Sequence, residues 1–290
     1  MAEHSGISWC DATFNPWIGC AKVSPACDHC YAERWAARFG RVGWGSPPGR
    51  TSAANWREPL AWNAKAVRTG RGLRVFCASL GDVFDNAVPA AWRADLWSLI
   101  ETTPALTWML LTKRIGNAQR MLPEAWLDRP RPNVWLGATV VNQQEADRDT
   151  PKLLATPAAL RFLSCEPLLG RVDLEEVPVG MFGPLRPYGG CSVRNPRINW
   201  VIVGGESGPG ARPMHPEWAR SIRDQCINAQ VPFHFKQWGE WAPNCLCGTR
   251  DAHRTTRRPE PGKMGVMFRC GRRRAGRELD RKVWAEFPAP

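Results

Sequence analysis

Short apolar runs rich in β-branched and aromatic residues recur along the chain, and each ends in a polar or glycine-containing turn. This pattern predicts strands at residues 74–79, 107–112, 134–140, 160–165, 199–205 and 232–237. Helical patterns separate the runs, at about residues 25–39, 89–101, 115–121, 143–155 and 216–228. The last of these helices begins with Pro216 in its first turn and carries an apolar stripe of Trp218, Ile222 and Cys226.

Continuous apolar strands that alternate with helices predict an α/β fold with a parallel sheet buried on both faces. About six to seven β/α units fit a partial or complete (β/α) barrel or an open doubly wound sheet. With 290 residues, 43% of them hydrophobic, the chain is long enough for one large domain. We expect this domain at residues 1–242, with a Gly- and Pro-rich insertion at 176–198 that could be a lid or substrate loop. A basic C-terminal extension would follow at 243–290.

Polar side chains follow almost every predicted strand. In a parallel α/β sheet the ligand groups sit at the carboxyl ends of the strands, so these side chains should converge on one rim. A single one of them would be read as a helix cap or a solvent-facing turn, but together they favour a pocket. The group comprises Asp82, Lys113, Thr139, Asn142, Glu166, Glu206, Lys236 and Gln237.

Three of the eleven cysteines lie within eleven residues, as Cys20, Cys27 and Cys30 in the spacing C-x6-C-x2-C. The chain shows no signal-peptide pattern and no run of eighteen apolar residues, so we expect a cytoplasmic location without a membrane partner. An odd number of cysteines in that reducing compartment argues against a disulfide framework and favours a metal site at the cluster. Cysteines that stand alone in apolar runs are expected in the core: Cys77, Cys165 and Cys226.

Two kinds of metal site remain open for the three cysteines. A closed structural zinc site needs a fourth ligand. The candidates for it are Cys10, His29, Cys245 and Cys247. A [4Fe–4S] cluster on three thiolates needs no fourth protein ligand and leaves one iron open to an external molecule. A second metal site, in which Cys245 and Cys247 join Cys270 or His253, is a further alternative.

The formal net charge is +12, and an excess of seven basic residues lies in residues 249–290 alone. The body of the chain is therefore only mildly basic. Two interpretations fit the charged tail equally well, a solvated basic segment and a phosphate-binding surface for nucleic acid.

An ordered set of segments carries a resemblance to a known family. The segments span roughly residues 7–242 and read "WCDATFNPWIGCAKVSPACDHCYAE", "RVFCASLGDVFD", "LLTKR", "VWLGATVVNQQEADR", "RFLSCEPLLG", "WVIVGGESGPGARPM" and "PFHFKQWGEW". In them the chain resembles the phage-borne three-Cys-motif family, a group of largely uncharacterised proteins. That family in turn resembles radical SAM enzymes, most closely their spore photoproduct lyase-like branch. The usual cluster spacing there is C-x3-C-x2-C, whereas the first gap of this chain is six residues.

The resemblance implies a barrel of the radical SAM type that binds a [4Fe–4S] cluster on Cys20, Cys27 and Cys30 together with S-adenosylmethionine. The residues that would contact S-adenosylmethionine are His29 and Tyr31 beside the cluster, Ser79 and Asp82 at the methionyl amino group, Thr139 and Asn142 at the ribose, and Glu166 at the nucleoside. In "GGESG", Gly204 and Gly205 would allow close backbone approach to a ligand, with Glu206 facing the pocket. A tight turn before the helix at 216 explains the same five residues equally well.

The implied activity is reductive cleavage of S-adenosylmethionine to a 5′-deoxyadenosyl radical that acts on nucleic acid or a nucleotide, as in phage DNA modification or repair. Flavodoxin or ferredoxin would be the electron donor. Lys113, Arg114, Lys236 and Gln237 would face the substrate, and Trp238 or Trp241 could stack on a base.

Two alternatives remain open, and the first belongs to another functional class. The chain could be a non-catalytic nucleic-acid-binding protein that contains zinc or a cluster, or a radical enzyme that acts on a peptide or small metabolite. The sequence indicates no particular oligomeric state.

Overall fold

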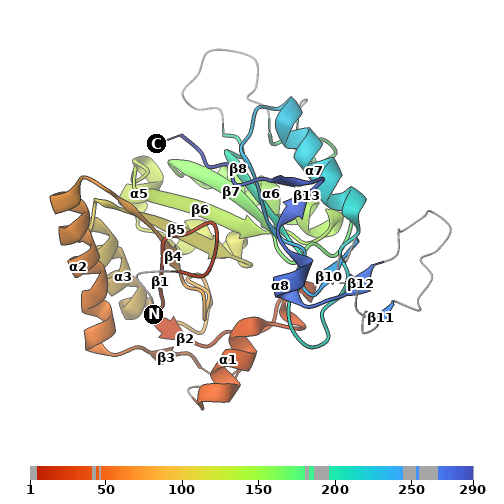
Figure 1. Cartoon of the computed structure of the whole chain (residues 1–290). Helices are drawn as coiled ribbons and strands as arrows, with labels where there is room; N and C mark the ends of the chain where they lie inside the picture. The colour runs from red at the N-terminus through yellow and green to blue at the C-terminus, as the bar shows by residue number, and fades with distance from the viewer. Residues whose placement is uncertain are drawn as a thin grey trace. The chain divides into compact units, whose positions relative to one another are not determined.

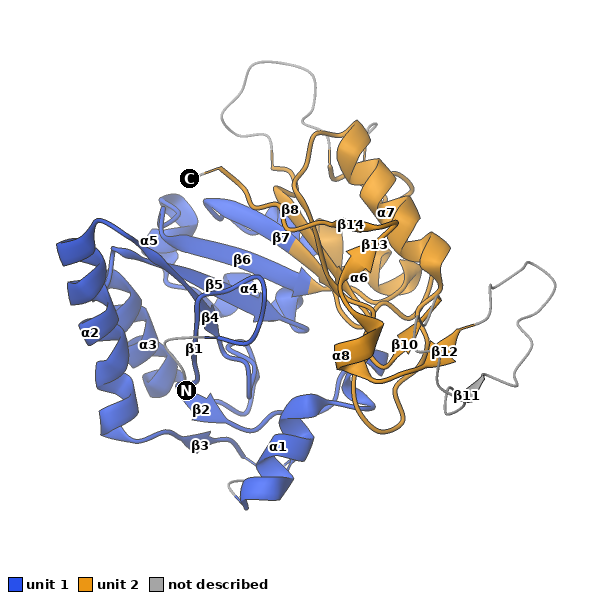
Figure 2. Ribbon diagram, viewed as in Figure 1, with its two compact units in different colours: residues 1–138, 152–162 blue, residues 139–151, 163–290 orange. Residues whose placement is uncertain are grey.

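The computed structural model describes residues 5–40, 44–45, 47–179, 183–185, 196–243, 253–254 and 267–289. The chain divides into two compact units (Figure 2). Unit 1 comprises Met1–Ala138 and Lys152–Phe162, and unit 2 comprises Thr139–Pro151 and Leu163–Pro290. Most of the insertion predicted at 176–198 lies outside the described residues, as do Cys245, Cys247 and the side chain of His253.

Seven strands form the main sheet, in the order β1-β4-β5-β6-β7-β8-β9. Their bounds are Ala12–Phe14 (β1), Leu73–Cys77 (β4), Leu106–Thr112 (β5), Val134–Thr139 (β6), Leu160–Cys165 (β7), Trp200–Gly204 (β8) and Phe233–Gln237 (β9). In unit 1 the pairs β1–β4, β4–β5 and β5–β6 are parallel, and in unit 2 so is β8–β9. The α/β class and all six predicted strands are confirmed. Neighbouring strands follow chain order, as in a partial β/α barrel, rather than the reversed order of a doubly wound sheet.

The helices of unit 1 pack beside its strands, and Figure 1 shows α2 and α3 side by side along them. Their bounds are Tyr31–Phe39 (α1), Ala53–Thr69 (α2), Ala90–Thr102 (α3), Ala118–Met121 (α4) and Glu124–Asp128 (α5). The sequence pattern predicted α3 and α4 but missed α2, because Pro59 interrupts its interior. Ser52 caps α2 through the backbone N–H of Asn55, and Gly70 ends it in the left-handed conformation.

The helix predicted at 25–39 is wrong in its first half. Pro25–Cys27 forms a single 3-10 turn, and α1 starts only at Tyr31. Cys30 has extended backbone angles and stands as the N-cap of α1, which breaks the helix inside the cysteine segment. The predicted C-terminal end is right, because Gly40 adopts the left-handed conformation after Phe39.

Two predicted helices border or belong to unit 2, namely α6 (Gln143–Ala155) and α7 (Pro216–Asn228), and both are confirmed. Ala219, Ile222 and Cys226 form the buried face of α7. The expected core cysteines are also confirmed, because Cys77, Cys165 and Cys226 are each 0% exposed. Burial raises the pKa of all three thiols, as expected of core groups.

Residues 267–289, which the sequence placed in a basic extension, pack within unit 2. This segment holds β12 (Phe268–Arg269), α8 (Arg272–Ala275), β13 (Glu278–Leu279) and β14 (Lys282–Val283), and β12 pairs with β10 (Trp241–Ala242) and β11 (His253–Arg254). The carbonyl of Trp284 accepts the backbone N–H of Phe235 on β9 at 2.9 Å. The indole N–H of Trp200 on β8 donates to the carbonyl of Glu286 at 2.9 Å. These contacts make the described C-terminal residues part of the unit 2 core.

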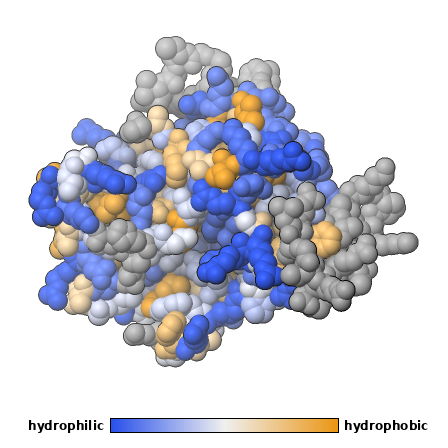
Figure 3. Space-filling model, viewed as in Figure 1, coloured by the Kyte–Doolittle hydropathy of each residue, from blue (hydrophilic) through white to orange (hydrophobic). Residues whose placement is uncertain are grey.

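None of the described helices is long and apolar enough to cross a bilayer. Figure 3 shows a face on which hydrophilic residues surround small, separate apolar patches.

Gly137 on β6 tests the packing of unit 1. A Cβ at this position would lie under 3.0 Å from three ring atoms of Phe162. We therefore expect Gly137→Ala to lower the free energy of unfolding by about 1–3 kcal/mol in urea titration, because the buried ring must shift. Gly6→Ala is the matched control, since its Cβ would meet nothing within 4 Å. Equal stability of the two variants would contradict this packing.

Asp280 tests how the C-terminal segment is fastened to α7. A hydrogen bond from Arg220, and a further one from Arg223, lower the pKa of Asp280 below its ordinary value, although burial acts in the opposite direction. The lowered pKa means that the carboxylate stabilises the fold above about pH 3.8, and that this contribution is lost as the pH falls through the lowered pKa.

We expect Asp280→Asn to reduce the free energy of unfolding by about 0.5 kcal/mol at pH 7, since the pair is partly exposed. The difference from the wild type should vanish as the pH falls below about 3.8. Asp128→Asn, at an exposed position on α5, is the control. A difference between wild type and Asp280→Asn that persists unchanged in acid would contradict the ion-pair account.

Candidate functional site

The segment that leads to Cys20 runs along the residues that follow β4. After β1 the chain forms β2 (Trp17–Ile18), which pairs with β3 (Gly49–Arg50) in antiparallel fashion. Gly19 then forms a parallel bridge with Gly81, and its N–H donates to the carbonyl of Leu80 at 3.0 Å. Cys20 therefore lies beside the turn that follows the carboxyl end of β4.

Arg114, just after β5, ties the start of the cysteine loop (residues 20–30) to the sheet. Its Nη1 lies 3.2 Å from the Cys20 Sγ and 3.2 Å from an oxygen of Asp82. Its Nη2 donates to the carbonyl of Ala21 at 2.7 Å and lies 3.0 Å from an oxygen of Asp85. Only 9% of the side chain is exposed, so these ion pairs are shielded from water.

The carboxylate of Asp82 is saturated by donors from the protein. One oxygen accepts the hydroxyl of Thr112 at 2.7 Å and the N–H of Phe84 at 2.9 Å. The other accepts the N–H of Lys113 at 3.1 Å and the guanidinium of Arg114. Asp82 was predicted to bind a cofactor, and in this arrangement it instead joins the ends of β4 and β5.

Burial raises the pKa of the Cys20 thiol to about 12, and the charge of Asp82 adds to this rise while Arg114 opposes it. Burial by itself lowers the pKa of Arg114, but the charges of Asp82 and Asp85 and the hydrogen bond to Cys20 raise it overall. The guanidinium is thus charged at any working pH and stands next to the sulfur atom.

Asn15 fixes the turn after β4, and the sequence analysis missed it. Its side chain is buried, accepts the N–H of Leu80 at 2.6 Å and donates to the hydroxyl of Ser79 at 3.0 Å. Tyr31 reaches the same turn, because its hydroxyl donates to the Ser79 carbonyl at 2.6 Å. A lone asparagine between apolar residues carries no pattern that would single it out, since its partners lie 64 and 65 residues away.

The other two cysteines of the loop differ in their surroundings. Cys27 is buried in the 3-10 turn that Ser24 caps, and Cys30 is half-buried as the N-cap of α1. All three are free thiols, which is the donor chemistry that a [4Fe–4S] cluster requires. Within the described residues, however, no three His, Cys, Asp or Glu side chains form a group that could hold a metal ion. The donor set therefore fits a cluster by its chemistry, although the described side chains are not arranged as a metal site.

Cys10 does not belong to this loop. It precedes β1, at the opposite end of the strand from Asn15, and its thiol donates to the hydroxyl of Ser5 at 3.3 Å. Cys10 therefore lies at the amino end of β1, whereas Cys20 follows the carboxyl end of this strand.

Unit 2 holds a second set of predicted residues. Lys236 at the end of β9 pairs with Glu166 after β7, with 3.2 Å between Nζ and Oε1. A Cβ on Gly204 would lie 2.6 Å from the same oxygen, so a larger residue would push this carboxylate aside. These three residues were predicted on different strands, and the structure brings them together.

Glu206 and its neighbours make a separate cluster in unit 2. Its buried carboxylate accepts the backbone N–H of Arg212 at 2.8 Å and the guanidinium at 2.7 and 2.9 Å. A Cβ on Gly205 would collide with the carbonyl of Trp238, which explains the glycine by backbone packing. Gln237 donates to the hydroxyl of Ser207 at 2.9 Å.

The remaining predicted residues of unit 2 are buried or make hydrogen bonds within the protein. Thr139 is buried at the end of β6, and the side chain of Asn142 accepts the N–H of Glu145, as a helix cap does. Trp238 is 4% exposed and donates to the carbonyl of Glu278 at 2.8 Å. Trp241 donates to the carbonyl of Ala211 at 2.6 Å. These contacts fit packing better than a surface on which a base could stack.

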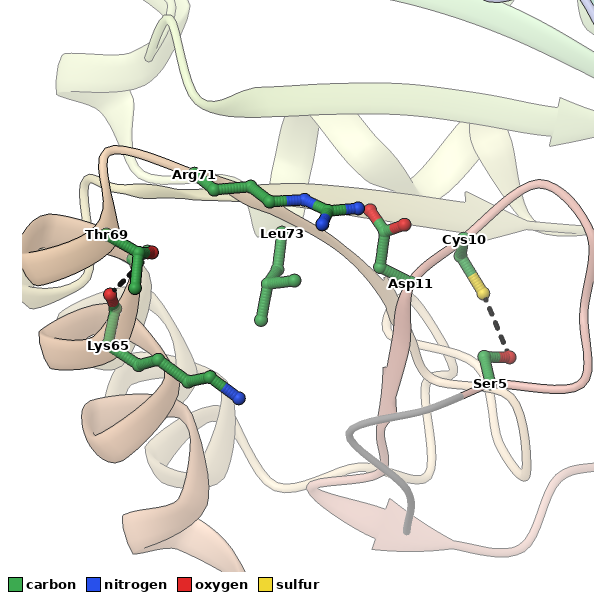
Figure 4. Close-up of a pocket in the computed structure, with 8 residues that line it drawn as sticks. Ser5, Cys10, Asp11, Lys65, Thr69, Arg71 and Leu73 are labelled. Carbon is green, nitrogen blue, oxygen red and sulfur yellow. Dashed lines mark hydrogen bonds between the residues drawn. The ribbon is translucent and has the colours of Figure 1, made fainter.

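A cavity of about 310 Å³ in unit 1 lies at the other end of the strands (Figure 4). Asp11, just before β1, and Leu73, at the start of β4, line it. Asp11 pairs with Arg74, outside the lining, at 2.9 Å, and Arg71 of the lining extends toward Asp11 in Figure 4. The cavity is therefore at the amino ends of β1 and β4, away from the cysteine loop.

Comparison with protein families finds a match over residues 4–288 to the family described as "Protein of unknown function (DUF5131)", and the chain belongs to this family. No curated protein and no solved structure matches the chain.

Asp82→Asn tests the hydrogen-bonded network of Asp82, Thr112 and Arg114 at the ends of β4 and β5. The amide keeps the size of the side chain but removes the charge that faces Arg114, so we expect the free energy of unfolding to fall by about 2 kcal/mol. Thermal or urea unfolding measures this loss, and Asp128→Asn on the exposed end of α5 is the control. If Asp82→Asn were as stable as the control, the contacts of Asp82 with Thr112 and Arg114 would not stabilise the fold.

Proposed function

We propose that this DUF5131 protein is an iron–sulfur enzyme of the radical SAM type, in which Cys20, Cys27 and Cys30 hold a [4Fe–4S] cluster. One observation carries the proposal: a loop with three free thiols begins where β1, β4 and β5 end, and Arg114 fastens its first cysteine there. The strand order that follows the chain supports a partial barrel of the radical SAM type. Ligand groups of such folds collect at this end of the strands.

A reduced cluster, when bound, would supply the electron for reductive cleavage of S-adenosylmethionine. The residues of this chain would prepare the site for it. Asn15 and Tyr31 hold the Ser79 turn, which would present its backbone and hydroxyl to the methionyl end of the molecule. Asp82 and Asp85 hold Arg114, and Arg114 would hold Cys20.

The proposed substrate class is nucleic acid or a nucleotide. The net charge of +12 supports it, because phosphate groups are attracted to a basic surface and steered by it. Lys113 is the basic residue of the unit 1 site that would face such a substrate, since its backbone N–H, rather than its ammonium group, holds Asp82. Flavodoxin or ferredoxin would serve as electron donor.

Anaerobic reconstitution with iron and sulfide tests the proposal. We expect the wild type to become brown and to cleave S-adenosylmethionine when reduced. Cys20→Ala, Cys27→Ala and Cys30→Ala should each lose most of the bound iron and the cleavage activity, because three thiolates are the minimum for this cluster.

Cys226→Ala is the matched control, since it removes a buried thiol on α7 in unit 2. It should keep both iron and activity. Wild-type protein that stays colourless and binds zinc at a fixed ratio would overturn the enzyme and favour the zinc-containing binding protein. A brown protein that cleaves S-adenosylmethionine but leaves DNA, RNA and nucleotides unchanged would remove the substrate class and point to a peptide or metabolite.

A further inference from the structure

Arg114 has the contacts of a residue that orders the protein rather than one that binds substrate. From its sequence position Arg114 was expected to face the substrate, as one of several basic residues at the strand ends. The guanidinium instead makes contacts with four groups of the protein: the sulfur of Cys20, the carbonyl of Ala21 and the carboxylates of Asp82 and Asp85. With 9% of the side chain exposed, little of it can meet a ligand.

The four contacts join three segments that are far apart in the sequence. Cys20 and Ala21 begin the cysteine loop, Asp82 and Asp85 follow β4, and Arg114 follows β5. Asp85 also accepts the N–H of Ala21 at 3.4 Å, which is a second contact with the cysteine loop. Its other oxygen accepts the N–H of Ala87 at 2.9 Å. Since residues 20–24 form no helix or strand, their position depends on contacts of this kind.

The planar shape of the guanidinium suits this task. Its two terminal nitrogens point to different acceptors at once, Nη1 to Cys20 and Asp82 and Nη2 to Ala21 and Asp85. A lysine ammonium is a single point of charge and could not span the same four acceptors. Asp82 and Asp85 hold the guanidinium in place, because both carboxylates are buried and each is fixed by backbone N–H groups.

We propose that Arg114 is a positioning residue that fastens the Cys20 end of the loop to the ends of β4 and β5 and donates a hydrogen bond to the Cys20 sulfur. The first half of this inference concerns the protein alone. The second half rests on the proposed function, because a hydrogen bond to a cluster-ligating sulfur stabilises the reduced, more negative state and raises the reduction potential.

Three variants separate these effects. Arg114→Gln removes the charge and most of the contacts. Arg114→Lys keeps the positive charge beside Asp82 and Asp85 but not the full set of contacts, so it separates the loss of charge from the loss of hydrogen bonds. Arg120→Gln is the matched control, since Arg120 is an exposed arginine of α4 whose contacts are with Asn86 and Asn117.

The first readout is hydrogen–deuterium exchange of the metal-free protein. We expect residues 19–24 to exchange roughly tenfold faster in Arg114→Gln, less so in Arg114→Lys, and at the wild-type rate in Arg120→Gln. The second readout is the midpoint potential of the reconstituted cluster, followed by electron paramagnetic resonance during reductive titration. It should move to more negative values in Arg114→Gln and Arg114→Lys and stay unchanged in Arg120→Gln.

The two readouts distinguish failure of this inference from failure of the proposed function. In one outcome, the wild-type protein takes up no cluster and the loop exchanges faster only in the Arg114 variants. This result would support the role of Arg114 in holding the loop. It would overturn the proposed function and the effect on the reduction potential that rests on it. A wild type that holds a cluster, with Arg114 variants equal to it in both exchange and potential, would overturn the role of Arg114 and leave the proposed function intact.

Discussion

The buried ion pairs of Arg114 with Asp82 and Asp85 are the interaction on which the candidate site depends. They join the ends of β4 and β5, and through Arg114 they reach the first cysteine of the loop. Charges taken out of water are costly unless each finds a partner with good geometry, and here every oxygen of Asp82 has protein donors. The loop start has no regular secondary structure, so this network acts together with the Gly19–Gly81 bridge to keep Cys20 beside the sheet.

Much of the fold could be predicted from the sequence because its strands are continuous apolar runs. A parallel sheet covered on both faces gives each strand this signature, and the runs at 107–112 and 160–165 fall within one residue of β5 and β7. The misses also have physical reasons. β1 spans three residues, too few to show a period, and α2 contains Pro59, which argues against a helix. The helix expected from residue 25 starts at Tyr31, because Cys30 takes the extended conformation of an N-cap.

The candidate site could be predicted only in part. Residues at the carboxyl ends of strands can be named from the sequence, and Asp82, Arg114, Glu166 and Lys236 do lie there. Their roles could not be predicted, because a role depends on partners that the fold brings close. Arg114 and Cys20 are 94 residues apart, and Asn15 and Leu80 are 65 apart. Polar residues that follow the strands can thus be located from the sequence as candidates for a site. Hydrogen bonds between distant segments then decide which of these side chains are already used by the protein and which can still contact a ligand.

We propose that the loop at residues 20–30 holds a [4Fe–4S] cluster with one iron open to S-adenosylmethionine. Electron paramagnetic resonance of the reconstituted and reduced wild-type protein tests it most directly, with spectra recorded before and after S-adenosylmethionine is added. We expect the signal of a reduced [4Fe–4S] cluster whose g-values change when S-adenosylmethionine is added, because this molecule would bind the iron that has no protein ligand. A cluster signal that S-adenosylmethionine leaves unchanged would contradict the open iron. The absence of any cluster signal would contradict the cluster itself.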